Sequence, residues 1–371
     1  MTEPSGPEPT VPEQVYHAYG RRIASALPLP ELRTAPPGDP VHWRFEVVAS
    51  LPEPQDPVLL GRETIYADVA ASLLRHRHGH RISVPDTGTF DLAPEEAGTT
   101  TIRWVPNPEP WWDFGRGHLL GRVLAMALHL EGILTLHGSA VEMADGVVGF
   151  LAPKHFGKST LSLRLYRAGA RFVTDDALPV LPTDPPTVLP GIQSLRVRAG
   201  DREVPVLAGG GTAMTPGEPT GGPAGGPLRG IRGRDGKIAL PPLPPGRILE
   251  KAAPLAALYL LDPVEAGHGM PAATRTRLPT LPGALGLVGQ AKIGAMLGPT
   301  AASSLLEAAS RIVGSVPVHR LSVVRDLERL PEVVETLVAW HGLPGPEPGP
   351  GQQAGSEPGF VREPDLLKED G

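Results

Sequence analysis

The sequence predicts an α/β protein with a small β-rich N-terminal part, and three observations support that class. Strand-like runs over 43–50 and 63–71 are separated by turns. Apolar residues then recur at helical spacing over 119–128. A strand, a glycine-containing turn and a helix follow one another over 147–167. Strands that give way to a strand–turn–helix unit are typical of α/β domains.

The chain is long enough for two domains, but it contains stretches that are poor in core-forming residues. Of its 371 residues, 45 are glycine and 46 are proline, while 40% are hydrophobic. The glycine- and proline-rich stretches cannot bury enough apolar surface to offset the entropy of ordering. We therefore predict a disordered N-terminus (1–14), the β-rich part (15–110), a larger α/β domain (111–342) with a flexible insert (206–236), and a disordered tail (343–371).

Composition and charge exclude several classes of partner and site. The formal net charge of −6 provides no overall basic surface, so we expect no nucleic-acid partner. The absence of cysteine excludes disulfides and thiolate metal sites. The most hydrophobic stretch, 118–136, contains Arg122, His129 and Glu131 and is too polar for a membrane span. The N-terminus lacks the basic and apolar regions of a secretory signal, so we expect a cytoplasmic protein without membrane contact.

The remaining elements follow from local pattern in chain order. Residues 119–128 place leucine, valine and alanine on one face, which predicts a helix. The runs 134–143 and 147–152 predict two strands, and the tight turn between them predicts a hairpin. Downstream, the pattern predicts a buried strand over 254–262, helices over 294–314 and 329–340, and a strand over 316–324.

The second strand of the hairpin leads into a motif typical of phosphate-binding loops. Such a loop needs a buried strand, a turn whose backbone amides converge on an anion, and a helix that begins with Lys and Ser or Thr. Here Lys158 would reach the terminal phosphates, the Ser159 hydroxyl would ligate Mg²⁺, and Gly157 would allow close approach of the backbone. The candidate nucleotide-binding residues are Ala152, Pro153, Lys154, His155, Phe156, Gly157, Lys158, Ser159 and Thr160.

One position departs from the G-x-x-x-x-G-K-[ST] pattern. Ala152 occupies the place of the first glycine, and the middle of the loop carries bulky residues. Alanine would be unfavourable there if the position required a positive φ. The strand before the loop and the amphipathic helix after it, which we expect to end at Gly169, match the required context and favour a working loop over a chance occurrence of the string.

Two aspartates follow the helix of the loop. Asp175 and Asp176 end a short apolar strand. If that strand is a parallel neighbour of the loop strand, both carboxylates point toward a bound Mg²⁺-nucleotide. One carboxylate would then hold the metal and its water, and the other would accept a proton from an attacking hydroxyl. A turn that merely begins with two aspartates is the alternative interpretation.

The stretch 134–181 resembles the C-terminal catalytic domain of the HPr serine kinase/phosphorylase family and its shorter relatives, including kinases that modify lasso-peptide precursors. The shared features are a His-Gly pair before a hairpin, an acidic residue that closes the first strand, a GKS or GKST loop and a double Asp on the next strand. The resemblance is weaker over 189–198 and 316–340. It implies a P-loop domain of the HPr-kinase/PEP-carboxykinase-like type.

The resemblance also implies roles for individual residues. Asp175 matches the proton acceptor for the substrate serine, with Asp176 beside it near the metal. His137 matches a histidine near the transferred phosphate, and Glu142 takes the place of an acidic residue. The implied catalytic residues are His137, Lys158, Asp175 and Asp176, and the implied metal ligands are Glu142, Ser159 and Asp176.

By the same resemblance, the protein would use ATP and Mg²⁺ to transfer the γ-phosphoryl group to a hydroxyl, namely a serine of a protein or peptide partner. Assembly into a homo-oligomer, as in relatives, is also possible. Two alternatives stay open. The first is a nucleotide-binding regulatory or scaffold subunit that keeps the fold without catalysis. This alternative is suggested by Ala152 and by the bulky residues in the middle of the loop. A small-molecule kinase is the other, because the fold alone does not choose an acceptor.

Overall fold

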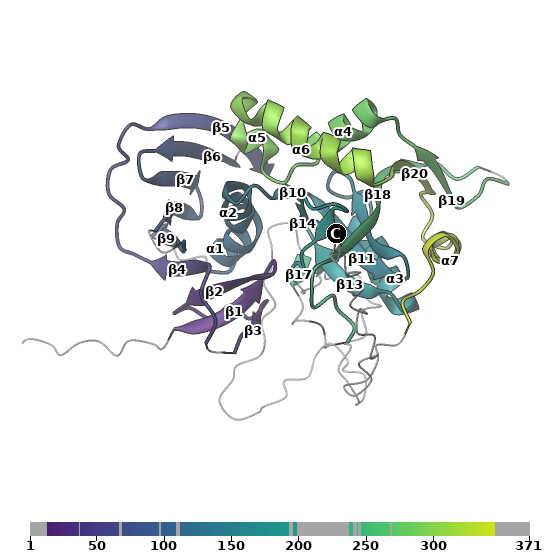
Figure 1. Ribbon diagram of the computed structural model, residues 1–371, viewed down its shortest axis with the longest axis horizontal. Helices are drawn as coiled ribbons and strands as arrows, with labels where there is room; N and C mark the ends of the chain where they lie inside the picture. The colour runs from purple at the N-terminus through teal and green to yellow at the C-terminus, as the bar shows by residue number, and fades with distance from the viewer. Residues whose placement is uncertain are drawn as a thin grey trace, which may run out of the picture.

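The computed structural model describes residues 13–36, 38–66, 69–95, 98–108, 112–192, 196–198, 237–239, 243, 246–267 and 269–345. Within these residues the protein is a mixed α/β structure with two large sheets (Figure 1). None of the helices in this part of the chain is long and apolar enough to cross a membrane. The insert predicted over 206–236 lies outside the described residues, as do the predicted N-terminal segment before residue 13 and the predicted tail beyond residue 345.

The first sheet is built entirely from the N-terminal third of the chain. Its described strands follow the order β3-β1-β2-β4-β9-β8-β7-β6-β5. Their bounds are β1 (Gln14–Ala18), β2 (Arg21–Ser25), β3 (Arg33–Thr34), β4 (Trp43–Val47), β5 (Val58–Tyr66), β6 (Val69–His76), β7 (Gly79–Val84), β8 (Gly88–Pro94) and β9 (Thr100–Pro106). Phe90 and Trp104 pair across β8 and β9, and their rings stack with centroids 5.5 Å apart. Such cross-strand aromatic pairs stabilise one face of a sheet.

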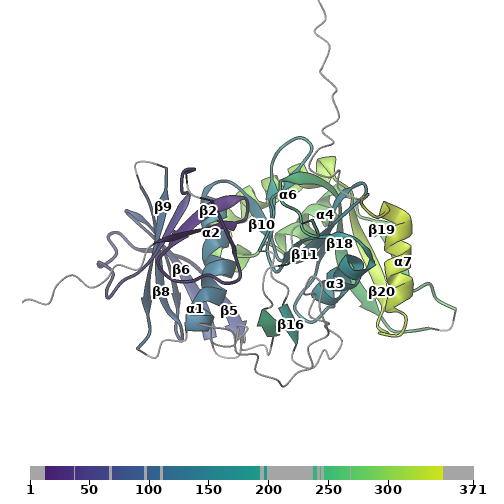
Figure 2. The same ribbon diagram turned by 90° about the horizontal axis from the view of Figure 1, so that it is seen from below.

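A helical segment lies between the two sheets (Figures 1 and 2). It consists of α1 (Trp112–His118), a π-helical turn η1 (Leu119–Val123) and α2 (Leu124–Leu130), and this confirms the helix predicted from the apolar spacing. Tyr19, from the turn after β1, donates a hydrogen bond of 2.8 Å to the carbonyl oxygen of Leu120. The buried face of the segment belongs to a core that includes side chains of both sheets. The helix thus joins the N-terminal sheet to the rest of the molecule.

The second sheet contains the predicted hairpin and the buried strands. Its main path is β10-β14-β15-β18-β12-β11-β13, with β20 paired to β18 and β19 paired to β20. The bounds are β10 (Leu134–Leu136), β11 (Gly138–Met143), β12 (Gly146–Leu151), β13 (Arg171–Asp175), β14 (Leu178–Leu181), β15 (Thr187–Val188), β18 (Ala253–Val264), β19 (Ala273–Arg277) and β20 (Val318–Val324). A separate pair is formed by β16 (Arg196–Arg198) and β17 (Lys237–Ala239).

Two expectations about this sheet need correction. The run 134–143 forms two strands instead of one: β10 pairs with β14, β11 pairs with β12 and β13, and His137 lies at the break. The strand that ends in Asp175 is not the direct neighbour of β12, because β11 lies between them. Since β11 is antiparallel to both, β12 and β13 still run in the same direction. Their carboxyl ends therefore reach the same edge of the sheet.

Helices cover both faces of the second sheet. One face packs against α3 (Lys158–Ala168) and α7 (Leu330–His341), and the other packs against α4 (Thr280–Val288) and α6 (Ala302–Ser315). The short helices α5 (Gly294–Leu297) and η2 (Pro299–Ala301) precede α6 and lie beside β5 (Figure 1). The helix predicted over 294–314 is thus interrupted at Gly298, where φ is 69°.

The helix α4 was not expected from the sequence. Its interior contains Pro282, Gly283 and Gly286, and these residue types have low helix propensity. A Cβ atom at Gly286 would lie 2.4 Å from a side-chain carbon of Leu260. A larger residue at that position would have to displace the end of the Leu260 side chain, so glycine favours close packing of α4 onto β18 and compensates for its low propensity.

Candidate functional site

Three strand ends meet at one edge of the second sheet. The last residue of β12, Leu151, pairs with the first residue of β11, Gly138. On the other side of β11, Ser139 pairs with Asp175, the last residue of β13. The backbone N–H of Asp176 donates to the carbonyl oxygen of Gly138 at 2.9 Å. The residue before β11, the loop after β12 and the aspartate after β13 are consequently neighbours.

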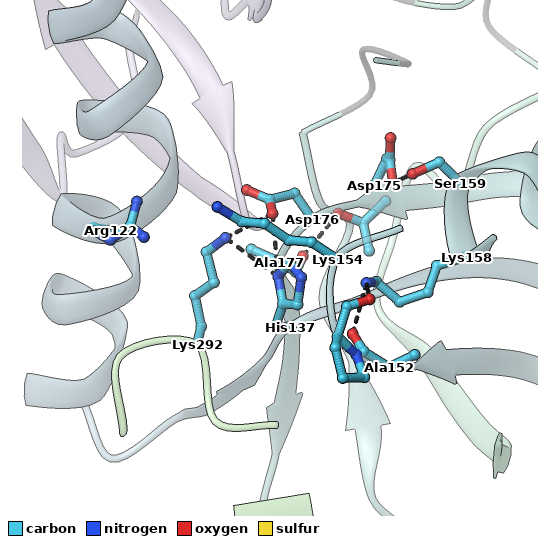
Figure 3. Close-up of polar contacts among 12 residues, drawn as sticks. Arg122, His137, Ala152, Lys154, Lys158, Ser159, Asp175, Asp176, Ala177 and Lys292 are labelled. Carbon is cyan, nitrogen blue, oxygen red and sulfur yellow. Dashed lines mark hydrogen bonds and ion pairs between the residues drawn. The ribbon is translucent and has the colours of Figure 1, made fainter. Parts of the chain in front are cut away.

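The loop after β12 contains two positive φ angles and leads directly into α3. His155 and Gly157 adopt positive φ angles of 70° and 87°, and α3 begins directly afterwards at Lys158. The Nζ atom of Lys158 donates hydrogen bonds to the carbonyl oxygens of Ala152 (2.6 Å) and Pro153 (2.9 Å), as Figure 3 shows for Ala152. The first N–H groups of a helix lack partners within it and attract anions. The ammonium group and the helix N-terminus thus lie together at the loop.

The alanine in place of the first motif glycine fits this backbone. Ala152 is not among the described non-glycine residues with positive φ. Its side chain is 2% exposed and belongs to the core that contains Phe150 and Leu161. The position therefore tolerates a methyl group, and the concern about the departure from the motif does not apply to the loop's conformation. The helix ends at Ala168 with Gly169 as C-cap, at φ 122°, as predicted.

The first aspartate contacts the start of the helix. The Ser159 hydroxyl donates a hydrogen bond of 2.7 Å to Oδ1 of Asp175 (Figure 3). Asp175 is only 7% exposed. The Ser159 hydroxyl, which would ligate a metal ion, therefore lies in direct contact with the Asp175 carboxylate beside the loop.

The second aspartate belongs to a different cluster. Oδ1 of Asp176 lies 3.2 Å from Nδ1 of His137 and 2.6 Å from Nζ of Lys292 (Figure 3). Lys292 was not singled out from the sequence, and the residues around it form no recognisable motif. The backbone of Asp176 has φ 105°, which is rare for a residue with a side chain. Strained backbone of this kind is concentrated at functional sites.

The surroundings of His137 favour its neutral form. Burial lowers its pKa below the ordinary value, the positive charge of Lys292 lowers it further, and the hydrogen bond with Asp176 opposes both effects. In the neutral ring the Nδ1–H donates to Asp176. Nε2 is then the acceptor nitrogen, and within the described residues this buried atom has no hydrogen-bond partner. An imidazole nitrogen without a partner beside a carboxylate is suited to contact a substrate group.

The N-terminal sheet contributes one wall of the site. Nζ of Lys154, in the loop, donates a hydrogen bond of 3.2 Å to the carbonyl oxygen of Ile65 on β5. Glu63, two residues before Ile65 on β5, forms an ion pair of 2.8 Å with Arg122 from η1. The adjacent Gly121 lies so close that a Cβ atom there would be 3.7 Å from Oδ2 of Asp176. These contacts between β5, η1 and the loop were not expected from the sequence.

Glu142 is not brought to the site. It pairs with Val147, at the end of the hairpin away from the loop. Its carboxylate accepts a hydrogen bond of 2.7 Å from Nε of Arg171. The register of β11 separates it from Gly138 by four residues, which is about 13 Å along a strand. The structure thus supplies no geometry for Glu142 as a ligand of a metal at the loop.

The remaining residues fit Mg²⁺ held together with nucleotide phosphates. Magnesium prefers hard oxygen donors and is commonly bound through one or two carboxylates plus substrate phosphates. The donor set of Ser159 and Asp175, a hydroxyl and a carboxylate in direct contact, matches that chemistry. Among the residues that the structure describes, no group of three or more His, Asp or Glu side chains is arranged to hold a metal. A metal here would therefore depend on the phosphates for its other ligands.

Comparison with known proteins gives likenesses to solved structures but no match to a family or a curated protein. No protein-family model and no curated protein matches the chain. Among solved structures, the HPr(Ser) kinase/phosphatase from Coxiella burnetii aligns at 13% identity with a TM-score of 0.27, over 55% of this chain and 93% of the other. A likeness at that level carries no weight for function, which has to be inferred from the geometry of the site.

Proposed function

We propose that the protein is an ATP- and Mg²⁺-dependent kinase of HPr-kinase type that phosphorylates a serine hydroxyl of a protein or peptide. The main support is the contact between Ser159 and Asp175 at the start of α3, with Asp176 adjacent and joined to His137 and Lys292. A phosphate-binding loop with two carboxylates at its mouth is the arrangement that phosphoryl transfer to a hydroxyl requires.

The structure suggests a division of labour between the aspartates that reverses the one implied by the resemblance. Asp175 is bonded to the loop serine, so we assign it to the metal side of the site. Asp176 lies on the other side, beside His137, and we assign it the acceptor side. Bound ATP with Mg²⁺ would supply the γ-phosphoryl group and part of the charge neutralisation.

In the proposed reaction, Lys158 and the amides at the start of α3 hold the phosphates in place. The acceptor oxygen attacks the γ-phosphorus while the bond from phosphorus to the leaving ADP oxygen breaks. The proton of the acceptor hydroxyl passes to a carboxylate oxygen of Asp176. The protein thus acts through positioning and charge stabilisation, which provide most of the catalysis in phosphoryl transfer.

The test is transfer of label from γ-labelled ATP by the full chain to protein, peptide and metabolite fractions of a cell extract. We expect label in serine of a macromolecule. Lys158→Met should abolish transfer, and Asp176→Asn should lower kcat by about 10²–10⁴-fold, the range for loss of a general base. Asp175→Asn should instead raise the Mg²⁺ concentration needed for half-maximal rate. Lys251→Met, on an exposed lysine, is the matched control.

Each alternative predicts a different result. Tight ATP binding without label in any fraction would identify a nucleotide-binding subunit and overturn the proposal. Label confined to metabolites would identify a small-molecule kinase. Undiminished transfer by Lys158→Met would show that the loop is not the phosphate site.

A further inference from the structure

Lys292 reaches the site through a backbone contact that fixes its position. The segment 290–292 lies alongside β10: Ala291 forms an antiparallel bridge with Leu136, and the N–H of Lys292 donates to the carbonyl oxygen of Thr135 at 2.8 Å. In the other direction, the N–H of His137 donates to the carbonyl oxygen of Gln290 at 2.6 Å. The chain that carries Lys292 is therefore tied to the same segment that carries His137.

The side chain of Lys292 is almost completely enclosed. It is 8% exposed, and its Nζ lies 2.6 Å from Oδ1 of Asp176 and 3.5 Å from Nδ1 of His137. Withdrawing an ammonium group from water is costly unless it is paired and hydrogen-bonded. Apolar residues would fill such a place at lower cost if only packing mattered. The presence of a lysine at this position is therefore explained by its ion pair with the Asp176 carboxylate.

The ammonium acts on the oxygen that His137 also contacts. With both donors on Oδ1, rotation of the Asp176 carboxylate is restricted, and its negative charge is balanced. The positive φ of Asp176 is energetically unfavourable, so without other contacts this residue would relax to a different backbone conformation. Lys292 thus holds in place a side chain whose backbone is strained.

We propose that Lys292 is a positioning residue for phosphoryl transfer: its ammonium fixes the Asp176 carboxylate in the orientation that receives the acceptor hydroxyl. This inference rests on the proposed function and adds a residue 155 positions away from His137 in the sequence to the reaction centre. It differs from a purely structural role, in which Lys292 would only neutralise a half-buried charge.

The experiment compares Lys292→Met, Lys292→Arg and the exposed-site control Lys251→Met in the transfer assay with the full chain. We expect Lys292→Met to lower kcat on the order of 100-fold, the cost of a small misplacement of a reacting group, while the KM for ATP changes little. Lys292→Arg keeps the positive charge and should recover part of the rate. Thermal unfolding of each variant establishes that it is folded.

A double-mutant cycle decides whether Lys292 acts through Asp176. Because the effect is transmitted by the carboxylate, Lys292→Met combined with Asp176→Asn should be no slower than Asp176→Asn alone. A wild-type kcat in folded Lys292→Met, or losses that multiply in the double variant, would overturn the inference while leaving the kinase in place. If Lys292→Met does not fold, Lys292→Gln, which also removes the positive charge, takes its place, and a wild-type kcat in folded Lys292→Gln would overturn the inference. Absence of transfer by the unaltered protein would instead defeat the proposed function, and the inference with it.

Discussion

Two polar residues of the site have a left-handed backbone, His155 at φ 70° and Asp176 at φ 105°. For residues with a side chain, such angles cost on the order of 1–3 kcal/mol each and persist only where neighbouring contacts impose them. For Asp176 those contacts are the hydrogen bond of its N–H to Gly138 and the pairs with His137 and Lys292. The strain is therefore localised at the residue whose carboxylate contacts His137 and Lys292.

Glu142 provides a residue-scale test of the site's composition. Because its carboxylate pairs with Arg171 and lies away from the loop, Glu142→Gln should leave the transfer rate and the Mg²⁺ dependence unchanged. The free energy of unfolding should fall by about 1–3 kcal/mol, because the change weakens a charge-assisted hydrogen bond between two largely enclosed side chains. Transfer assays at varied Mg²⁺ and urea denaturation measure the two effects. A raised Mg²⁺ requirement would restore Glu142 to the metal site.

At the scale of elements, α7 is fastened to β18 by a chain of hydrogen bonds whose central members, Tyr259 and His341, are buried. Nη1 of Arg275 donates to the Tyr259 oxygen at 3.0 Å, and the Tyr259 hydroxyl donates to Nε2 of His341 at 2.8 Å. Nδ1–H of His341 then donates to Asp145 at 2.8 Å. Burial raises the pKa of Tyr259, so the hydroxyl keeps its proton. The guanidinium also lies 4.4 Å from the ring centre of Trp340, a favourable cation–π contact.

Removal of a single atom should loosen this helix. Tyr259→Phe deletes the shared hydroxyl and leaves the buried ring of His341 without that partner, which we expect to cost about 1–3 kcal/mol of unfolding free energy. Urea denaturation measures the loss, and hydrogen exchange should show faster exchange in α7. Thr336→Ala is the control, because the Thr336 hydroxyl bonds only to a carbonyl of its own helix. Equal stability of Tyr259→Phe and the unaltered protein would show that the network contributes nothing.

At the scale of the whole molecule, the site lies where the two sheets approach each other across the segment α1–η1–α2 (Figure 2). The loop after β12 belongs to the second sheet, while β5 of the first sheet accepts a hydrogen bond from Lys154 in that loop. Because α5 packs against β5 and the segment 290–292 pairs with β10, this stretch of chain links the first sheet to the segment that carries Lys292. Relative movement of the sheets would therefore alter the site.

The global stability should fall in mild acid. Burial lowers the pKa of both His80 and His129 below 6.5, and the nearby charge of His76 is a further cause for His80. Between the lowered folded-state pKa and 6.5, the unfolded chain binds protons that the folded chain does not. Stability is therefore fully present above pH 6.5 and declines as the pH falls toward the folded-state pKa. We expect the urea midpoint to drop between pH 7.5 and 5.5.

A variant isolates this contribution. His129→Gln removes one titrating group, so the difference in urea midpoint between pH 7.5 and pH 5.5 should shrink relative to the unaltered protein. His78→Gln, in the exposed turn between β6 and β7, serves as the control. The explanation would be wrong if His129→Gln retained the full pH dependence.

The sequence alone located the elements whose pattern is local. The loop after β12, the helix from Lys158, its end at Gly169, the strand that ends in Asp175 and the helix over 119–128 all follow from short-range spacing, glycine placement and amphipathic periodicity. These features depend on backbone conformations that neighbouring residues favour, so the printed order of residues is sufficient to find them.

Only the tertiary structure decided which distant side chains meet. Lys292 stands in a stretch with no motif, and it joins the site because 290–292 pairs with β10. Gly121 approaches Asp176 because η1 turns toward it. In the same way, β11 lies between β12 and β13 in the sheet, and the hairpin register places Glu142 at the end of β11 away from the loop. Such contacts depend on how sheets and helices pack over long sequence separations, and local residue preferences contain no information about that packing.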